Sequence, residues 1–256
     1  MNVDVRPKKH LGQHFLHDAQ VAQRIVDSLS AAHAEAVLEI GPGMGVLTNM
    51  LSPRLGDKLW AVELDTESVD YLRTHLPALT PHLLNVDFLK IDIKTITTGN
   101  LAVIGNLPYN ISSQIFFKIL DYRQQVNEVV AMVQREVAQR IAAPPGSRTY
   151  GILSVLLQAF YRIDYLFTVG EGAFVPPPKV KSAVIRLERN SVEHLDCSET
   201  MFFRVVKAAF NQRRKTLRNS LRAAFADVAV PDEFAQKRPE QLSVADFVRL
   251  TNLLMG

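Results

Sequence analysis

Residues 36–45 read Ala-Val-Leu-Glu-Ile-Gly-Pro-Gly-Met-Gly and join an apolar run to a glycine-rich turn. A short apolar run that ends at glycine indicates a buried strand, so we predict a strand over residues 36–40. The turn has the spacing Gly-x-Gly-x-Gly, whereas dinucleotide-binding turns have Gly-x-Gly-x-x-Gly. Pro42 lacks the backbone N–H that a pyrophosphate would bind, so the turn favours a ligand without phosphates. The alternative is a purely structural turn, although three glycines exceed what a tight turn requires.

Apolar runs of this kind alternate with helical patterns along the first half of the chain. Further strands are predicted at 59–64, 82–86, 101–105 and 128–133, and intervening helices at 18–29, 66–76 and 112–120. Such alternation is typical of a doubly wound, mostly parallel α/β sheet. Two later apolar runs, 163–169 and 183–187, are separated by glycine-rich and proline-rich loops. We therefore expect a final antiparallel strand pair that ends the sheet.

The pattern changes after residue 188. Residues 189–199 are polar and irregular, and every later pattern is helical. We predict a Rossmann-like α/β domain over residues 1–188 and a small all-helical domain over residues 189–256.

Composition limits the classes of protein to consider. The chain has 256 residues, of which 47% are hydrophobic and 21% charged, as expected for a soluble globular protein. Cys197 is the single cysteine, so no intrachain disulfide can form, and no apolar run approaches the roughly 20 residues of a membrane span. These features predict a cytoplasmic protein, and we expect a monomer. His10, His14 and His17 could suggest a metal site, but no acid or thiolate completes a ligand set with them, so we predict none.

Three acids follow predicted strands at equal spacing. Glu39, Glu63 and Asp87 are each 24 residues apart, about one strand plus one helix. The carboxyl ends of parallel strands line one crevice, so we expect these side chains to meet there. Glu63 has the placement of an acid that accepts hydrogen bonds from both ribose hydroxyls, and Asp87 is placed to accept from an adenine amine beside the Phe88 ring. An adenosine-bearing ligand without phosphates fits this set, and S-adenosylmethionine is such a ligand.

Residues 106–109, Asn-Leu-Pro-Tyr, directly follow the predicted strand over 101–105. Asn106 offers a neutral side-chain carbonyl, Pro108 removes a backbone donor, and Tyr109 offers a ring face for stacking. The turn can therefore hold a flat exocyclic amine of a nucleobase. The alternative interpretation is an ordinary turn that ends a strand.

The sequence resembles the small-subunit (16S) ribosomal RNA adenine dimethyltransferases nearly end to end. These class I methyltransferases place two methyl groups on N6 of each of two adjacent adenosines in the hairpin near the 3′ end of that RNA. The resemblance rests on five blocks, at residues 11–16 (LGQHFL), 39–48 (EIGPGMGVLT), 106–112 (NLPYNIS), 174–180 (FVPPPKV) and 209–221 (AFNQRRKTLRNSL). The last block is the most discriminating, because methyltransferases of many kinds share the glycine-rich turn.

The resemblance implies roles for individual residues. The residues implied in binding S-adenosylmethionine are Gln13, His14, Leu16, Gly41, Gly43, Glu63, Asp87 and Asn106. The residues implied in holding and methylating the target adenine are Asn106, Leu107, Pro108, Tyr109 and Phe174. Two positions depart from the family pattern, since His14 stands where Asn is usual and Lys181 stands where an acid is frequent. Neither departure touches the expected chemistry.

Methyl transfer from a sulfonium to an amine requires orientation and not a strong base. We expect the adenine to be flipped out and stacked between Tyr109 and Phe174. The carbonyl of Asn106 and the Leu107-Pro108 backbone would accept the two N6 hydrogens and aim the nitrogen lone pair at the methyl carbon. A carboxamide does not take up a proton near neutral pH, so Asn106 is not a general base.

Basic residues predict an RNA-binding surface near the C-terminus. Between residues 201 and 225 there are seven basic residues and no acidic ones. A solvated helix face usually mixes both signs, so we favour phosphate contacts. The predicted RNA-binding residues are Lys179, Lys181, Arg213, Arg214, Lys215, Arg218 and Arg222. Helical periodicity predicts two helices that meet near Asn211, with the basic run at the junction, and Arg6, Lys8 and Lys9 are expected to extend this surface as a flexible arm.

Two other functions stay open from the sequence. Large-subunit rRNA methyltransferases of the macrolide-resistance type share the cofactor blocks, but they tend to have Ile at the Leu107 position and lack the 210–221 block. A binding factor that checks ribosome assembly, with methylation secondary, is the second alternative. The favoured partner is small-subunit rRNA within a partly assembled 30S subunit, and the expected product of the cofactor is S-adenosylhomocysteine.

Overall fold

The computed structural model of the chain describes residues 5–226 and 228–255. The described residues form two compact units, one from residues 5–138 with 164–189 and the other from residues 139–163 with 190–226 and 228–255. The two predicted domains include residues 1–4, 227 and 256, which lie outside the described residues. The boundary after residue 188, which we predicted between an α/β domain and a helical domain, stays a prediction.

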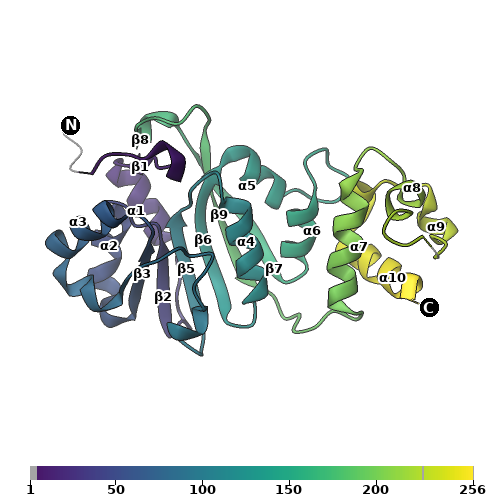
Figure 1. Ribbon diagram of the computed structural model, residues 1–256, viewed down its shortest axis with the longest axis horizontal. Helices are drawn as coiled ribbons and strands as arrows, with labels where there is room; N and C mark the ends of the chain where they lie inside the picture. Colours follow the sequence, from purple (N-terminus) through teal and green to yellow (C-terminus); the bar gives the residue numbers. More distant parts are fainter. Residues whose placement is uncertain (1–4, 227, 256) are drawn as a thin grey trace. The chain divides into compact units, whose positions relative to one another are not determined.

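A seven-stranded sheet forms the centre of the α/β fold in the described part of the chain (Figure 1). Its strands are β2 (Ala36–Ile40), β3 (Leu59–Glu63), β4 (Leu83–Asn85), β5 (Leu101–Asn106), β6 (Val126–Gln134), β7 (Tyr161–Val169) and β9 (Ser182–Arg189). They lie in the order β4-β3-β2-β5-β6-β9-β7. Strands β2 to β6 pair in parallel and β9 pairs antiparallel to β6, so the predicted mostly parallel sheet with a final antiparallel part is confirmed.

Helices connect the strands and cover the sheet. The helices of this region are α1 (Ala19–Asp27), α2 (Val46–Leu55), α3 (Thr66–His75), α4 (Ser112–Asp121) and α5 (Arg135–Ile141). Asp18 caps α1 because its carboxylate accepts from the backbone N–H groups of Gln20 and Val21. Helices α1, α2 and α3 bury their apolar faces against alternate strand residues such as Val37 and Ile104, which builds one core layer.

Strand β2 lies between β3 and β5, so the chain order reverses there and the strand ends open a crevice. Gly105 in β5 lets the two central strands approach closely. A Cβ added at Gly105 would lie 2.5 Å from the backbone oxygen of Ile40 in β2, a contact that no side chain could make without moving the backbone. Glycine is therefore required where β5 approaches the end of β2.

A second, two-stranded sheet joins the N-terminus to the loop before β9. Strands β1 (Phe15–Leu16) and β8 (Phe174–Val175) pair antiparallel, with Leu16 opposite Phe174. The sequence did not predict this pair, because two-residue strands are too short to show alternation. It fixes residues 15–16 beside the strand ends that form the crevice.

The second unit is helical apart from the first residues of β7. Its helices are α6 (Ile152–Gln158), α7 (Glu199–Asn211), α8 (Leu217–Leu221), α9 (Asp232–Ala235) and α10 (Val244–Met255). Phe202, Phe210 and Phe247 are buried in it, and the rings of Phe210 and Phe247 lie 6.0 Å apart. The predicted helix junction near Asn211 is confirmed, since α7 ends at that residue. Short 3₁₀ turns are described at Lys9–Leu11, Gly56–Lys58, Pro77–His82, Ile93–Thr95, Glu171–Ala173 and Pro239–Gln241.

Candidate active site

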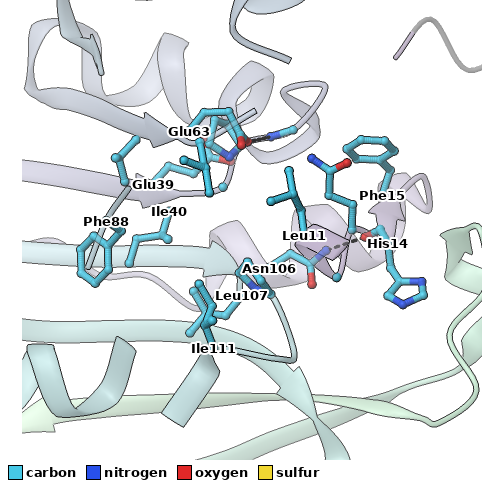
Figure 2. A pocket seen from close by; sticks show the side chains of 18 of the residues that line it. Leu11, His14, Phe15, Glu39, Ile40, Glu63, Phe88, Asn106, Leu107 and Ile111 are labelled. Carbon is cyan, nitrogen blue, oxygen red and sulfur yellow. Dashed lines mark hydrogen bonds between the residues drawn. The ribbon is translucent and has the colours of Figure 1, made fainter. Parts of the chain in front are cut away.

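A cavity lies at the carboxyl ends of β2, β3 and β5 and is partly lined by the N-terminal segment (Figure 2). We call residues 5–16 the N-terminal strap. Five short segments contribute the lining residues, which are 10–16, 39–44 with 46–47, 62–64, 86–89 and 106–111. The cavity therefore joins the predicted cofactor residues to the Asn-Leu-Pro-Tyr turn, although 95 positions separate Leu16 from Ile111 in the sequence.

The glycine-rich turn forms one wall of the cavity. Gly41, Gly43 and Gly45 have φ of 66°, 57° and 78°, which side-chain-bearing residues rarely adopt. Backbone conformation alone therefore explains all three glycines, and their number is not independent evidence for a ligand. The open side of Gly41 is more informative, because a Cβ added there would meet nothing within 4 Å. The turn presents bare backbone to the cavity at that position.

Glu63 ends β3 with a buried carboxylate that faces the glycine-rich turn. One oxygen accepts the Gly43 N–H at 3.1 Å, and the other accepts the Asp65 N–H at 2.9 Å. Burial raises the pKa of Glu63, and these two hydrogen bonds oppose the shift. A carboxylate has about four acceptor sites, so the Glu63 side chain can accept two more hydrogen bonds from a ligand.

Glu39 lies deeper in the same wall and is 1% exposed. Its carboxylate accepts the Thr48 hydroxyl at 2.7 Å. Burial is the main cause that raises the pKa of Glu39 to about 7, the Thr48 hydrogen bond opposes it, and the nearby Glu63 charge adds to it. A large fraction of Glu39 is therefore protonated at neutral pH.

Asp87 follows β4 and lines the cavity next to the buried ring of Phe88. One carboxylate oxygen accepts the Leu89 N–H at 2.9 Å, which fixes the side chain in a tight turn. Leu64 and Val86 also line the cavity although they are 50% and 39% exposed. These apolar surfaces beside a carboxylate can pack against a flat ring and accept from its amine.

The side-chain amide of Asn106 has a defined orientation at the end of β5. Its nitrogen donates to the backbone oxygen of His14 at 2.9 Å. Because a backbone carbonyl only accepts, the amide nitrogen must face His14 and the amide oxygen is held away from it. The next residue, Leu107, uses its N–H to bind the Met132 oxygen at 3.0 Å. Asn106 therefore offers a fixed, neutral acceptor at the cavity, as Figure 2 shows.

Tyr109 lies beside His14, with the ring centroids 5.5 Å apart and the planes 30° from parallel. The Tyr109 hydroxyl is hydrogen-bonded to the buried hydroxyl of Ser182. Burial raises the pKa of Tyr109, which outweighs the opposite effect of that hydrogen bond. The ring is thus held at its far end and stays neutral. The His14 ring nitrogen Nδ1 lies 2.8 Å from the Pro176 oxygen.

Phe174 does not lie with the other predicted target residues. It is 2% exposed in β8, belongs to the core layer of the sheet and is not among the residues that line the cavity. Its predicted partner in stacking, Tyr109, does line the cavity. The structure therefore brings together Asn106, Leu107, Pro108 and Tyr109 but leaves Phe174 outside that group.

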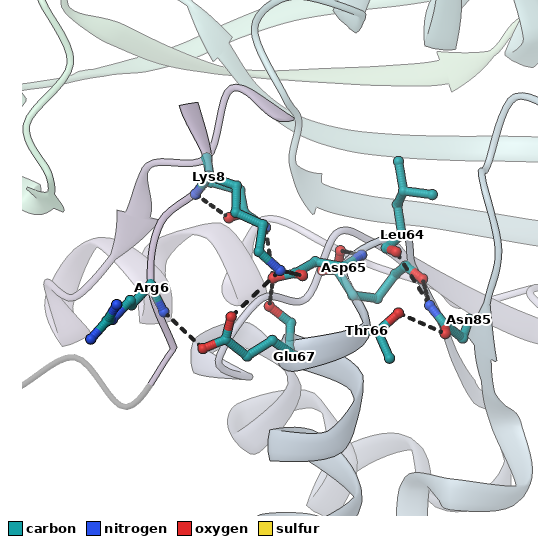
Figure 3. Close-up of polar contacts among 10 residues, drawn as sticks. Arg6, Lys8, Leu64, Asp65, Thr66, Glu67 and Asn85 are labelled. Atoms are coloured by element: carbon teal, nitrogen blue, oxygen red, sulfur yellow. Dashed lines mark hydrogen bonds and ion pairs between the residues drawn. The ribbon is translucent and has the colours of Figure 1, made fainter. Parts of the chain in front are cut away.

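Lys8 and Asp65 form a polar cluster that the sequence did not reveal (Figure 3). The Lys8 ammonium pairs with the buried Asp65 carboxylate and lies 3.4 Å from Glu67. Gln13 accepts the Lys8 N–H at 2.8 Å and donates to Asp65 at 3.2 Å. The expectation that Lys8 extends the basic surface as part of a flexible arm is wrong, because its ammonium is paired with Asp65. Asp65 was missed because 57 residues separate it from Lys8.

The predicted RNA-binding residues belong to both units, and all of them are exposed except Arg213, which is half-buried. Lys179 and Lys181 are exposed in the loop before β9. In the second unit, Arg213, Arg214 and Lys215 lie between α7 and α8, and Arg218 and Arg222 follow in and after α8. The Arg213 guanidinium donates to the Arg148 oxygen, and Arg218 lies 3.6 Å from Asp232. The junction therefore concentrates positive charge.

Within residues 5–226 and 228–255, no group of three or more His, Cys, Asp or Glu side chains is arranged to hold a metal ion. In the same ranges, no helix is both long and apolar enough to cross a membrane.

The sheet order, the glycine-rich turn after the first parallel strand and the acids at the next strand ends define a class I methyltransferase of the Rossmann-like kind. The model of the ribosomal RNA adenine dimethylase family matches residues 5–254. The chain belongs to that family.

Curated relatives are similar over nearly their whole length. A ribosomal RNA small subunit methyltransferase A from Parabacteroides distasonis is 57% identical over 251 residues, which cover 96% of this chain and 93% of the relative. The protein of the same name from Cytophaga hutchinsonii is 55% identical, with 98% of each chain covered.

Two solved structures share the fold. A dimethyladenosine transferase from Plasmodium falciparum superposes with a TM-score of 0.77 at 24% identity and covers 93% of this chain and 96% of its own. The 23S rRNA methyltransferase ErmE superposes with a TM-score of 0.68 at 26% identity and covers 94% of this chain and 100% of its own.

Proposed function

We propose that the protein dimethylates N6 of two adjacent adenosines in the 3′-terminal hairpin of small-subunit (16S) rRNA, with S-adenosylmethionine as the methyl donor. The observation that carries the proposal is the fixed orientation of Asn106. Its amide oxygen is an acceptor without charge, next to the Leu107 carbonyl and in the same cavity as Glu63. Family membership supports an adenine in ribosomal RNA as the target, and the names of the two relatives support the small subunit.

The cavity fits S-adenosylmethionine in its donors, acceptors and apolar surfaces. Glu63 has acceptor capacity left for ribose hydroxyls, and Asp87 lies beside apolar surface for adenine. Gly41 presents open backbone, and the strap residues Gln13, His14 and Leu16 line the remaining wall. We assign these residues, with Gly43 and Asn106, to cofactor binding. When bound, the cofactor supplies an electrophilic methyl group and leaves as S-adenosylhomocysteine.

The chain's own residues would orient the target amine. The Asn106 side-chain oxygen and the Leu107 backbone oxygen accept the two N6 hydrogens, which draws the nitrogen out of conjugation with the ring. Its lone pair can then form the new N–C bond as the S–C bond breaks. Tyr109 offers its ring face to the adenine, and its hydroxyl is fixed by Ser182. We do not assign the opposite face to Phe174, because that ring is buried in the core.

No residue has to act as a base. Charge disperses in the transition state when a neutral amine displaces a neutral sulfide from a sulfonium, and the surplus proton leaves to water after transfer. The monomethylated base keeps one hydrogen for the two acceptors and the dimethylated base keeps none. Loss of both hydrogen bonds then favours release of the finished product.

We further propose that the exposed basic residues bind RNA phosphates and that the substrate is a partly assembled 30S subunit. The residues assigned to this contact are Lys179, Lys181, Arg213, Arg214, Lys215, Arg218 and Arg222. A ribosomal substrate supports a cytoplasmic location, where we expect the protein to act as a monomer.

Methylation of large-subunit rRNA is the second candidate, because the 23S rRNA methyltransferase ErmE shares the fold. The relatives named for the small subunit are more than 50% identical to this chain, whereas ErmE is 26% identical. The decisive experiment supplies labelled cofactor with unmodified small and large subunits and maps the label by mass spectrometry. We expect dimethyladenosine at two adjacent positions of small-subunit RNA, and label confined to large-subunit RNA would refute the proposal.

Replacement of Asn106 tests the mechanism. Asn106→Ala should lower turnover at saturating cofactor by roughly a hundredfold, because the amine loses an orienting acceptor. The dissociation constant of the cofactor should change much less. Asn252→Ala, in the other unit, is the control and should leave both quantities unchanged. Lost cofactor binding with intact turnover at saturating cofactor would contradict the assigned role.

A further inference from the structure

The N-terminal strap is held at two separate places along the cavity wall. Residues 10–16 of the strap line the cavity, and Val5 at its start is 1% exposed. At one place, the backbone oxygen of His14 accepts from Asn106. At the other, Lys8 and Gln13 both bind Asp65, the residue before α3. The strap is therefore attached to the ends of two different strands of the sheet.

Asp65 has the properties of a fixed anchor. Its side chain is 1% exposed, against 32% for the Lys8 side chain. The carboxylate accepts from Lys8, from Gln13 at 3.2 Å and from the Ser68 hydroxyl at 2.9 Å. Burial alone raises the pKa of Asp65, but these hydrogen bonds outweigh it and hold the pKa below its ordinary value. Asp65 is thus ionised at neutral pH and needs its partners, because an unpaired buried carboxylate is strongly unfavourable.

The same residue is also bonded to the predicted ribose acceptor. The Asp65 backbone N–H donates to a Glu63 oxygen at 2.9 Å, and the Gly43 N–H donates to the other oxygen. One residue therefore holds the strap through its side chain and orients Glu63 through its backbone. A change of the Lys8 side chain removes the ion pair to Asp65 and leaves both the Gln13 contact and the backbone hydrogen bond to Glu63 in place.

We propose that Asp65 is a positioning residue that fastens the N-terminal strap, through Lys8 and Gln13, over bound S-adenosylmethionine. This inference rests on the proposed function. Gln13 is the direct link, since its amide joins the backbone of Lys8 to Asp65 and its own position lines the cavity. The ion pair keeps cofactor and product in the cavity and acts on their dissociation, and it has no part in the chemistry at the adenine amine.

The test compares Lys8→Met with the wild type and uses S-adenosylhomocysteine as the probe. Calorimetry should show a dissociation constant roughly tenfold higher in Lys8→Met, because without the charge-assisted contact to Asp65 the strap has to be ordered at the expense of binding free energy. Stopped-flow measurements should place most of the change in the dissociation rate. With unmodified small subunits, KM for S-adenosylmethionine should rise by a similar factor while kcat falls by less than twofold.

The matched control is Lys9→Met, which removes an exposed neighbouring lysine and should leave the dissociation constant unchanged. Asp65→Asn should raise the dissociation constant about as much as Lys8→Met does. The double variant should not exceed the larger of the two single-variant dissociation constants, because all three variants lose the same ion pair. Backbone hydrogen exchange in the strap should increase in both single variants.

Unchanged affinity and dissociation rate in Lys8→Met, with normal binding by the wild type, would overturn the inference and leave the proposed function standing. A fall in kcat without a change in KM would also overturn it. If the wild type itself failed to bind S-adenosylhomocysteine, the proposed function would fall, and this inference with it.

Discussion

The free energy of unfolding of Glu39→Gln, minus that of the wild type at the same pH, should increase from acidic to alkaline pH in the absence of ligand. The carboxyl group of Glu39 is buried, and its pKa is raised from 4.5 to about 7. An acid with a raised pKa in the folded state stays protonated there after it has ionised in the unfolded state. Its contribution to stability is full below pH 4.5 and is lost as pH rises through about 7. Glutamine cannot ionise, so the variant does not lose this contribution.

The magnitude follows from the two pKa values. Between pH 5 and pH 8 the free energy of unfolding of the wild type should fall by about 2.5 kcal/mol relative to Glu39→Gln, because each unit of pKa difference corresponds to about 1.4 kcal/mol. Above about pH 8 both states are ionised and the difference should become constant. The Thr48 hydroxyl can donate to the glutamine side-chain oxygen as it does to Glu39, so the substitution keeps that contact.

Urea unfolding at a series of pH values measures this difference directly. Other carboxylates titrate in the same range, so the quantity to plot is the variant minus the wild type at each pH. Glu136→Gln, which removes an exposed carboxylate of α5, is the control for the loss of one acid. A flat plot for Glu39→Gln, or stability that rises from pH 5 to pH 8 relative to the variant, would refute the reasoning about burial.

Two further predictions concern the target site and the RNA surface. Tyr109→Phe should keep most of the turnover, whereas Tyr109→Ala should lose at least roughly tenfold, because stacking needs the ring and is worth about 1–3 kcal/mol per base. Single-turnover assays measure both losses, and equal losses would show that the hydroxyl matters more than the ring. Replacing Arg213 and Arg214 together by Ala should weaken RNA binding and lower the slope of log affinity against log salt by about 1 for each phosphate contact removed, whereas an unchanged slope would exclude them from phosphate contact.

The parallel strands could be predicted because each is an apolar run that ends at a turn residue, and β2 begins and ends at the predicted residues. The two-residue strands β1 and β8 carry no such pattern, so the position of the strap could not be derived. The burial of the Phe174 ring could not be derived either, because it depends on the same pair of short strands. An aromatic residue beside a proline-rich loop is a reasonable stacking partner from sequence, but pairing with Leu16 places it in the core.

The candidate site was predictable where local sequence determines it. The acids at the strand ends follow from topology, and the position of Asn106 follows from its place at the end of β5. The hydrogen bond that orients the Asn106 amide and the ion pair of Lys8 with Asp65 were not predictable. Both join segments more than 50 residues apart, and their partners are ordinary residue types without a sequence signature.

The close approach at Gly105 lets the backbone set the distance between the glycine-rich turn after β2 and Asn106 at the end of β5. Strands β2 and β5 pair in register up to Glu39 and Ile104, and the Ile40 oxygen fills the space where a side chain at Gly105 would be. The glycine-rich turn and Asn106 both continue directly from these paired strands. Side-chain replacements in the cavity can therefore change which groups bind, but they leave the distance between the glycine-rich turn and Asn106 nearly constant. A target amine at another position on a base would therefore require the base to shift against Asn106, because the pairing of β2 with β5 keeps Asn106 at a fixed distance from the glycine-rich turn.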